Sequence, residues 1–160
     1  MKRLLMVLAM VCVMGSVASV FAGLKAAPDF SIPDLSGKTI TLSDFKGQVV
    51  ILDFWDTWCP PCKKGIPDFV SLYNENKDKG LVIIGLALGR EGKEKVVQFA
   101  KDKEITYPLV IATDKAIDDF GPIEGIPTTI VIDKNGNIVE RYTGFTEKSE
   151  FESVIAPLLK

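Results

Sequence analysis

The sequence predicts one α/β domain in which a central mixed β-sheet is flanked by helices. Residues 49–55 and 81–88 are apolar runs rich in β-branched side chains, as is typical of central strands that are buried on both faces. A segment with the apolar spacing of a helix follows each of them. Near the end, a hairpin signal at 134–137 precedes a last helical pattern. Strands that alternate with helices and end in a hairpin indicate a mixed sheet.

The region before the first apolar run is predicted to be an N-terminal extension of short elements. Residues 26–34 are expected to be extended, because Pro28 and Pro33 disfavour a helix there. A turn, a short strand and one helical turn are expected next, over 34–38, 39–42 and 43–47.

Apolar periodicity predicts the elements that follow. From Cys59 to about residue 76 the spacing i, i+3, i+4, i+7 predicts a helix, which Pro67 is expected to kink. Beyond the second apolar run we expect an exposed helix, a short strand, a short helix, a strand, its antiparallel partner and a final helix, over 93–103, 107–112, 114–120, 126–133, 138–143 and from 146 onward. Pro157 is expected to distort or stop the final helix.

The first residues are expected to be a targeting segment. A short basic start leads into an apolar stretch and then small residues, of which Val20 and Ala22 suit the −3 and −1 positions of a signal-peptidase site. We therefore expect a signal peptide over residues 1–22 and a folded domain over residues 23–160. The alternative is a retained N-terminal membrane anchor, because the apolar stretch is just long enough to span a bilayer.

Charge and length restrict the partners and the compartment. Without the leader, 17 basic residues stand against 21 acidic ones, a formal charge of −4. This balance disfavours a role in binding nucleic acid or a membrane surface. Cys12 is read as an inert residue of the leader rather than a lipid-attachment site, because Val11 before it is a poor match to such a site. The domain is expected to be periplasmic or secreted, where oxidised cysteine pairs persist.

Cys59 and Cys62 are the cysteines outside the leader, and they stand where the first central strand meets a helix. A helix N-terminus favours the thiolate, which is the species that attacks in thiol-disulfide exchange. A structural disulfide closing so short a loop would remove little entropy from the unfolded chain. A zinc site would usually need a second cysteine pair or histidines, and the chain has no histidine. The pattern therefore predicts redox catalysis.

Residues 49–64, which include both cysteines, resemble the active-site region of the thioredoxin superfamily. Within that superfamily they resemble the extracytoplasmic TlpA/ResA-like branch. Residues 125–136 are similar to the second hallmark of that branch. The extended opening around residues 28–30 and the extra segment between Leu88 and Pro108 resemble it too. The resemblance implies a thioredoxin-like fold with an N-terminal extension and an insertion between Leu88 and Pro108.

The resemblance also implies roles for single residues. Cys59 matches the nucleophilic cysteine and Cys62 the resolving one. Their places agree with this, since Cys59 lies at the helix start while Cys62 lies one turn in, where we expect it to be more buried. Pro127 matches a cis-proline that packs beside the disulfide, and the backbone of Ile126 would pair with an extended substrate segment. The alternative is an ordinary trans proline at the start of a strand.

Asp53 is a carboxylate within an apolar strand, which is costly unless it is paired or protonated. The resemblance places it beneath Cys62, where a raised pKa would let it take the Cys62 proton through water. The alternative is an aspartate at a strand end that binds a backbone amide. Many ResA-like relatives carry a glutamate three residues after the second cysteine, where this chain has Gly65, so we expect Asp53 to act alone.

Several residues near the cysteines are expected to contact the substrate. These are Trp58, Pro60 and Pro61, together with Ile126. An equal alternative for Trp58 is that it shields the disulfide from solvent. Trp55 is expected to pack in the core. Other basic residues are scattered over turns and a helix start and indicate no site, namely Lys77, Lys79, Arg90, Lys93 and Lys95.

The sequence thus predicts a thiol-disulfide oxidoreductase that acts on cysteine-containing protein substrates. The Pro60-Pro61 dipeptide and the lack of histidine favour a low potential and therefore a reductase. The resemblance implies substrates such as the haem-binding cysteines of apocytochrome c or metal-centre assembly proteins, and a membrane thiol electron donor. Beyond the redox-active Cys59–Cys62 disulfide we expect no cofactor and no metal. We expect a monomer.

Two other functions stay open at this point. The same fold serves disulfide oxidants and isomerases, which a measured potential would distinguish from a reductase. A metal-handling chaperone could instead hold a soft ion such as Cu(I) on the two cysteines, although no histidine or methionine would complete the ligand set. A peroxidase is disfavoured, because the lone peroxidatic cysteine context is absent.

Overall fold

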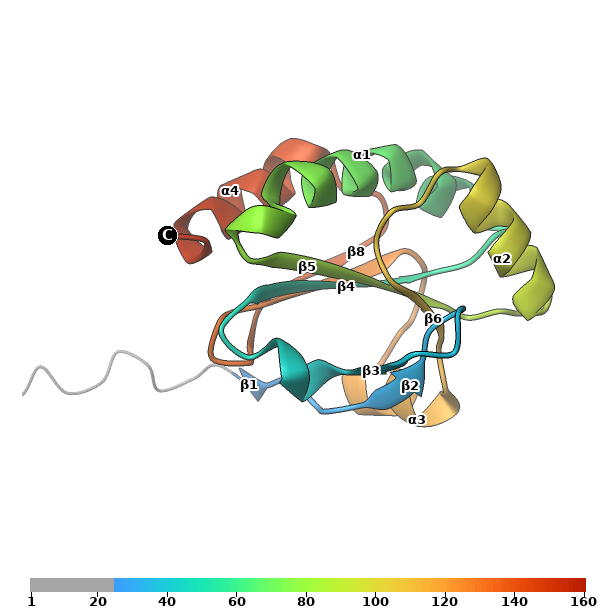
Figure 1. The fold of residues 1–160 in the computed structure, drawn as a ribbon, viewed down its shortest axis with the longest axis horizontal. Helices are drawn as coiled ribbons and strands as arrows, with labels where there is room; N and C mark the ends of the chain where they lie inside the picture. Colours follow the sequence, from blue (N-terminus) through green and yellow to red (C-terminus); the bar gives the residue numbers. More distant parts are fainter. Residues whose placement is uncertain (1–24) are drawn as a thin grey trace, which may run out of the picture.

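A computed structural model describes residues 25–160 (Figure 1). The expected signal peptide or anchor over residues 1–22, with Cys12, lies outside the described residues. The strands are β1 (Lys25–Ala26), β2 (Ser31–Pro33), β3 (Thr39–Thr41), β4 (Val49–Trp55), β5 (Leu81–Ala87), β6 (Leu109–Ile111), β7 (Thr128–Ile132) and β8 (Asn137–Thr143). The helices are α1 (Pro60–Asn76), α2 (Lys93–Asp102), α3 (Asp114–Phe120) and α4 (Lys148–Leu158), with short 3-10 turns at Leu42–Phe45 and Lys77–Lys79.

Six strands form the central sheet in the order β1-β8-β7-β4-β5-β6. β4 runs parallel to β5 and antiparallel to β7, so the sheet is mixed, as predicted. β7 and β8 form the predicted hairpin. The short β2 and β3 pair with each other in a separate two-stranded sheet.

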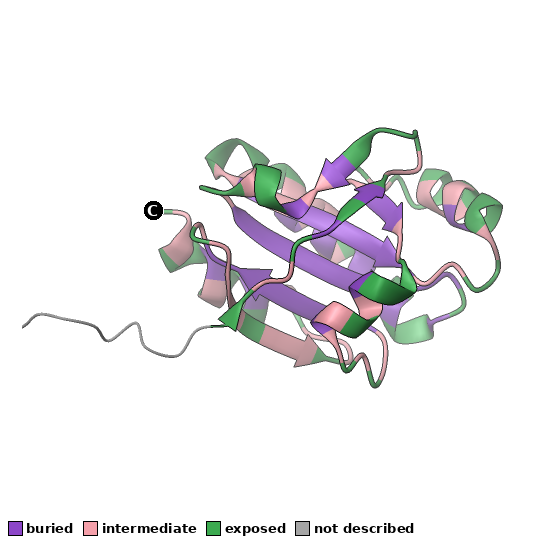
Figure 2. Cartoon of the chain, turned by 90° about the horizontal axis from the view of Figure 1, so that it is seen from below, coloured by how far each residue is buried: buried purple, intermediate pink, exposed green. Residues whose placement is uncertain are grey.

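Two layers cover the sheet (Figure 1). Helices α1, α2 and α4 lie over one face, whereas α3, the β2–β3 pair and the turn after β3 lie over the other. Every residue of β4 is buried, because this strand is covered on both faces (Figure 2). Side chains of β4 alternate between the layers, so that Ile51 and Trp55 pack under α1 while Leu52 and Phe54 face α3. Asp53 belongs to the α1 side by the same alternation.

The expected elements are present with small shifts at their ends. The ladder of β7 begins at Thr128 rather than at Ile126, since Pro127 has no N–H to donate to a neighbouring strand. The final helix runs through Pro157 and ends one residue later. The segment between Leu88 and Pro108 is an insertion that contains α2. None of the helices in residues 25–160 combines the length and the apolar composition that crossing a membrane needs.

Candidate active site

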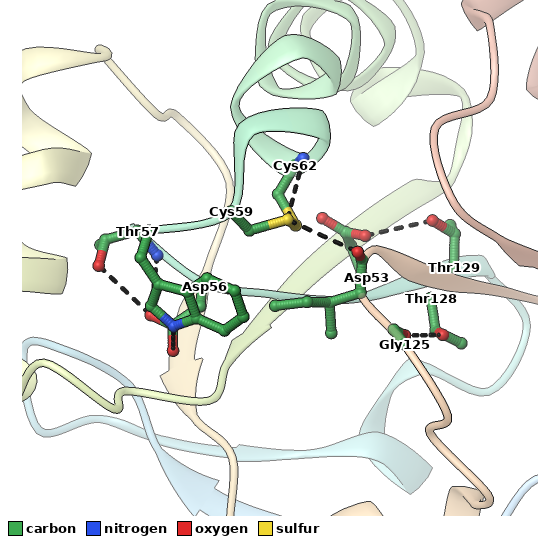
Figure 3. The surroundings of a disulfide bond; sticks show 10 residues. Asp53, Asp56, Thr57, Cys59, Cys62, Gly125, Thr128 and Thr129 are labelled. Carbon is green, nitrogen blue, oxygen red and sulfur yellow. Dashed lines mark hydrogen bonds between the residues drawn. A yellow bond between two sulfur atoms is a disulfide. The ribbon is translucent and has the colours of Figure 1, made fainter.

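Cys59 is the N-cap residue of α1, and Cys62 lies in the first turn of the same helix. The two form a disulfide with their Cα atoms 5.3 Å apart (Figure 3). The amide of Cys62 donates a hydrogen bond to Cys59 Sγ at 3.2 Å. A thiolate on Cys59 would therefore lie at the positive end of the helix dipole. This is the arrangement that the cysteine spacing predicted.

The expectation that Cys62 is more buried than Cys59 is wrong. Their exposed fractions are 3% and 2%, so the disulfide is covered about equally at both ends. Cover for Cys59 comes from outside the helix, because its sulfur lies 3.6 Å from the carbonyl oxygen of Ile126. Helix position alone does not reveal a neighbour that is far away in the sequence.

Pro60 and Pro61 occupy the first two positions of α1, and both are exposed. Proline suits this end of a helix, but it carries no N–H. The amide of Cys62 is therefore the first N–H that the helix can offer. Within residues 25–160, it donates the one hydrogen bond that Cys59 Sγ accepts. The Pro-Pro dipeptide thus limits how far the helix N-terminus can stabilise a thiolate.

The loop before β7 brings Ile126 and Pro127 to the disulfide. The peptide bond between them is cis, and Pro127 is buried. The carbonyl oxygen of Ile126 faces Cys59 Sγ at 3.6 Å. Both residues thus lie where the sequence placed them. Their part in substrate binding stays a prediction.

Asp53 lies within β4 with 1% of its surface exposed. Its carboxylate accepts a hydrogen bond from the hydroxyl of Thr129 at 3.2 Å, rather than from a backbone amide at a strand end (Figure 3). Burial raises the pKa of Asp53 to about 7, and the Thr129 hydrogen bond opposes this rise only in part. Asp53 can therefore exchange a proton near neutral pH.

A small pocket connects Thr129 with the disulfide. Its volume is about 10 Å³, room for about one water molecule, and Cys62, Thr129, Gly65 and Phe145 are among its lining residues. Gly65 contributes no side chain to it, and a Cβ there would make ordinary contact with the Phe145 ring at 3.8 Å. Thr129 thus both lines the pocket at Cys62 and donates a hydrogen bond to the carboxylate of Asp53.

Comparison with known proteins agrees with this geometry. Residues 24–141 match the sequence profile of the AhpC/TSA family. The chain belongs to this family. It is 35% identical over 161 residues to the thiol-disulfide oxidoreductase ResA of Bacillus subtilis (strain 168), a match that covers 94% of this chain and 89% of that protein.

Solved structures also resemble this AhpC/TSA-family protein. A thioredoxin-family thiol:disulfide interchange protein from Chlorobium tepidum TLS superposes with a TM-score of 0.81 at 34% identity, over 87% of this chain and 99% of that one. The exposed lipoprotein thioredoxin Etrx1 of Streptococcus pneumoniae strain TIGR4 gives a TM-score of 0.70 at 27% identity, over 82% of this chain and all of that one. The protein is thus a thioredoxin-fold thiol-disulfide oxidoreductase of the ResA type, acting on cysteine-containing proteins.

The two tryptophans of this ResA-like protein have different places. Trp55 is fully buried and packs on Phe99, as expected for a core residue. Trp58 has 43% of its surface exposed, beside Cys59 and the exposed Pro60 and Pro61. The predicted substrate-contact residues therefore gather at one edge of the disulfide.

Sequence reasoning missed one residue of this site. Asp56 is fully buried, and the indole Nε1–H of Trp58 donates a hydrogen bond to its carboxylate at 2.9 Å. Arg90, to which the sequence assigned no role, lies with its guanidinium 5.4 Å from the centre of the Trp58 ring. The only local signal for this role was that Asp56 is a second acidic residue, after Asp53, close to the cysteine pair. Among residues 25–160, no group of three or more His, Cys, Asp or Glu side chains gathers as a metal site.

Proposed function

We propose that this protein reduces disulfides, or keeps cysteine pairs reduced, in proteins outside the cytoplasm. The observation that carries this direction is the environment of Cys59 Sγ. A strong oxidant needs a reduced form that is stabilised, which in practice means a well-stabilised thiolate. Here Pro60 and Pro61 withhold two amide donors, and the chain has no histidine to supply another. A poorly stabilised thiolate gives up its electrons readily.

The reaction transfers two electrons and two protons from the enzyme to the substrate. The Cys59 thiolate attacks a substrate disulfide, which forms a mixed disulfide and releases one substrate thiolate. That thiolate takes up, through solvent, the proton that Cys59 lost when it ionised. Cys62 then attacks Cys59 Sγ, which releases the second substrate thiol and leaves the Cys59–Cys62 disulfide. A dithiol donor outside this protein returns the two electrons and two protons.

We further propose that Asp53 takes the proton from Cys62 in the second step. A pKa of about 7 suits a general base at neutral pH. Thr129 and the small pocket at Cys62 supply the path. Replacing Asp53 by Asn should slow the attack of Cys62 on a Cys59 mixed disulfide by about 10²-fold at pH 7. An unchanged pH profile of this step would sink the relay.

The substrate and the compartment are part of the proposal. One structural neighbour is an exposed lipoprotein. The basic and apolar start of this chain fits a signal peptide or anchor over residues 1–22. We propose that the substrates include the haem-binding cysteines of apocytochrome c, with a membrane thiol carrier as electron donor. A deletion strain that keeps normal levels of covalent cytochrome c would count against this substrate.

The reduction potential of the Cys59–Cys62 pair tests the direction. It is measured by equilibration with redox buffers, and fluorescence of Trp55 and Trp58 reports the state of the disulfide. A value near or below about −250 mV, close to that of thioredoxin, supports a reductase. A value above about −150 mV, towards that of DsbA, makes the protein an oxidant. Copper(I) that copurifies in a 1:1 ratio and is lost in Cys59→Ser would favour the chaperone.

A further inference from the structure

Asp56 is a fully buried carboxylate that the redox cycle above does not use. It stands in the turn between β4 and α1, three residues before Cys59. Its oxygens accept hydrogen bonds from the amide of Thr57 at 2.7 Å, the indole of Trp58 at 2.9 Å and the amide of Arg90 at 3.1 Å. A buried carboxylate is stable only when several donors surround it, and here three N–H groups donate to it.

These donors come from two segments that are distant in the sequence. Thr57 and Trp58 belong to the cysteine motif, whereas Arg90 lies 34 residues after Asp56, in the loop between β5 and α2. A second hydrogen bond joins the same segments, because Thr57 Oγ1 donates to Glu91 Oε2 at 2.7 Å. In Figure 3, Asp56 and Thr57 lie beside Cys59, on the stretch of chain that leads from β4 to α1. The loop is therefore fastened to the active-site turn.

Trp58 and Arg90 form an exposed edge as a result. Oδ2 of Asp56 accepts hydrogen bonds from both the indole of Trp58 and the backbone amide of Arg90, and the Arg90 guanidinium lies over the Trp58 ring. In residues 25–160, no carboxylate lies within 4.0 Å of a guanidinium nitrogen of Arg90. Its charge is available to a ligand. We refer to Trp58 and Arg90 as the Trp58–Arg90 rim.

We propose that Asp56 is a positioning residue that holds the Trp58–Arg90 rim beside Cys59, and that the rim selects substrates with a carboxylate next to the reacting cysteine. The proposal rests on the proposed function for its substrate class, a cysteine-containing protein segment. Trp58 offers a flat apolar surface to that segment, and Arg90 offers paired N–H donors that match a carboxylate.

The variant Asp56→Asn tests the positioning role at nearly constant volume. Its amide oxygen can still accept from Thr57, but its NH₂ group would face the Trp58 indole and the Arg90 amide, which are both donors. We expect the KM for insulin disulfides to rise about tenfold with kcat little changed, and activity on uncharged 2-hydroxyethyl disulfide to stay within about twofold. Hydrogen exchange at the Arg90 amide should accelerate. Equal losses on both substrates, or unchanged exchange, would reject the positioning role.

Asp133→Asn is the matched control. Asp133 is also a buried carboxylate that accepts from two backbone amides and one side-chain N–H, but it lies in the β7–β8 turn. If Asp56 acts only as a structural group, the two variants should have similar effects on KM. If Asp56 positions the Trp58–Arg90 rim as proposed, Asp133→Asn should lower the stability of the protein without raising the KM for insulin.

Arg90→Gln tests the charge selection separately. Two cystine peptides that differ only by Glu or Gln beside the cysteine should be reduced with different KM, the Glu peptide being favoured about fivefold or more. The preference should disappear in Arg90→Gln and survive in Lys93→Gln. A wild-type enzyme without preference, or a preference that survives in Arg90→Gln, overturns the selection. We expect the reduction potential to be unchanged in these variants. A high potential of the wild-type protein would refute the proposed reductase function. The KM measurements would still test the Trp58–Arg90 rim independently.

Discussion

Asp53 and Thr129 face each other as register partners in the antiparallel β4–β7 pair, and the Thr129 hydroxyl donates a hydrogen bond to the Asp53 carboxylate at 3.2 Å. Both side chains are buried. One hydrogen bond is little support for a carboxylate in the core, and so the neutral acid is favoured up to about pH 7. Proton exchange at this pair is therefore coupled to the stability of the whole domain.

The first prediction concerns stability against pH. Burial raises the pKa of Asp53 from 3.8 to about 7. Between these values the folded protein keeps a proton that the unfolded chain has released, so the free energy of unfolding should fall as the pH rises. The loss from this group should reach about 4 kcal/mol at pH 8. Urea unfolding of the oxidised protein at pH 4 and pH 8 measures it.

Asp53→Asn is the comparison for this measurement. The amide has no proton to release, so the variant should lose less stability than the wild type between pH 4 and pH 8, and at pH 8 it should be the more stable protein. Parallel pH curves for the two proteins would show that the pKa of Asp53 is not raised.

The second prediction concerns Thr129→Val. The Thr129 hydrogen bond lowers the pKa of Asp53 against the larger effect of burial. Valine keeps the shape but cannot donate, so the pKa should rise by about one further unit. The pH at which the stability curve levels off should move up by the same amount. Thr128→Val is the control, because the Thr128 hydroxyl donates to the carbonyl of Gly125 instead (Figure 3).

The third prediction concerns the dipeptide between the cysteines. Pro61→His should place a cation near Cys59 Sγ and lower the pKa of that thiol. Each unit by which the thiol pKa falls should raise the reduction potential by about 30 mV. Redox-buffer titration of the Trp58 and Trp55 fluorescence reports the change. Asn74→His, on an exposed later turn of α1, should leave the potential where it is. Equal shifts in the two variants would contradict a local effect.

The fourth prediction compares two glycines. A Cβ on Gly85 in β5 would lie 2.5 Å from Leu109 Cδ2 and 2.9 Å from Trp55 Nε1, so Gly85→Ala should destabilise the domain by about 1–3 kcal/mol. A Cβ on Gly65 in α1 would make ordinary contacts of 3.8 Å or more, and Gly65→Ala should stabilise the helix by about 0.5–1 kcal/mol. Urea unfolding at one pH measures both. The same sign for both variants would refute this account of the packing.

Much of the fold could be predicted because its signals are local. Apolar runs without polar alternation marked β4 and β5 as central strands, and the spacing after Cys59 marked α1. The start of strand β7 was predicted less well. The end of a strand depends on which N–H and carbonyl groups find partners, and the missing N–H of Pro127 delays β7 to Thr128.

By itself, the sequence determined the chemistry of this protein. Two cysteines three residues apart at a strand-to-helix junction, with prolines between them, define a dithiol at a helix N-terminus whatever surrounds it. The sequence also placed an acid inside the strand that leads to this junction. Those properties depend on residues that are close neighbours in the sequence.

Only the tertiary structure decided how these groups are used. Strand order and register bring Thr129 to Asp53 and the Ile126 carbonyl to Cys59, and the loop after β5 brings Arg90 to Asp56. These partners lie between 34 and 76 residues apart in the sequence. Periodicity and propensity describe near neighbours along the chain, whereas burial and hydrogen bonding depend on which distant segments the fold packs together.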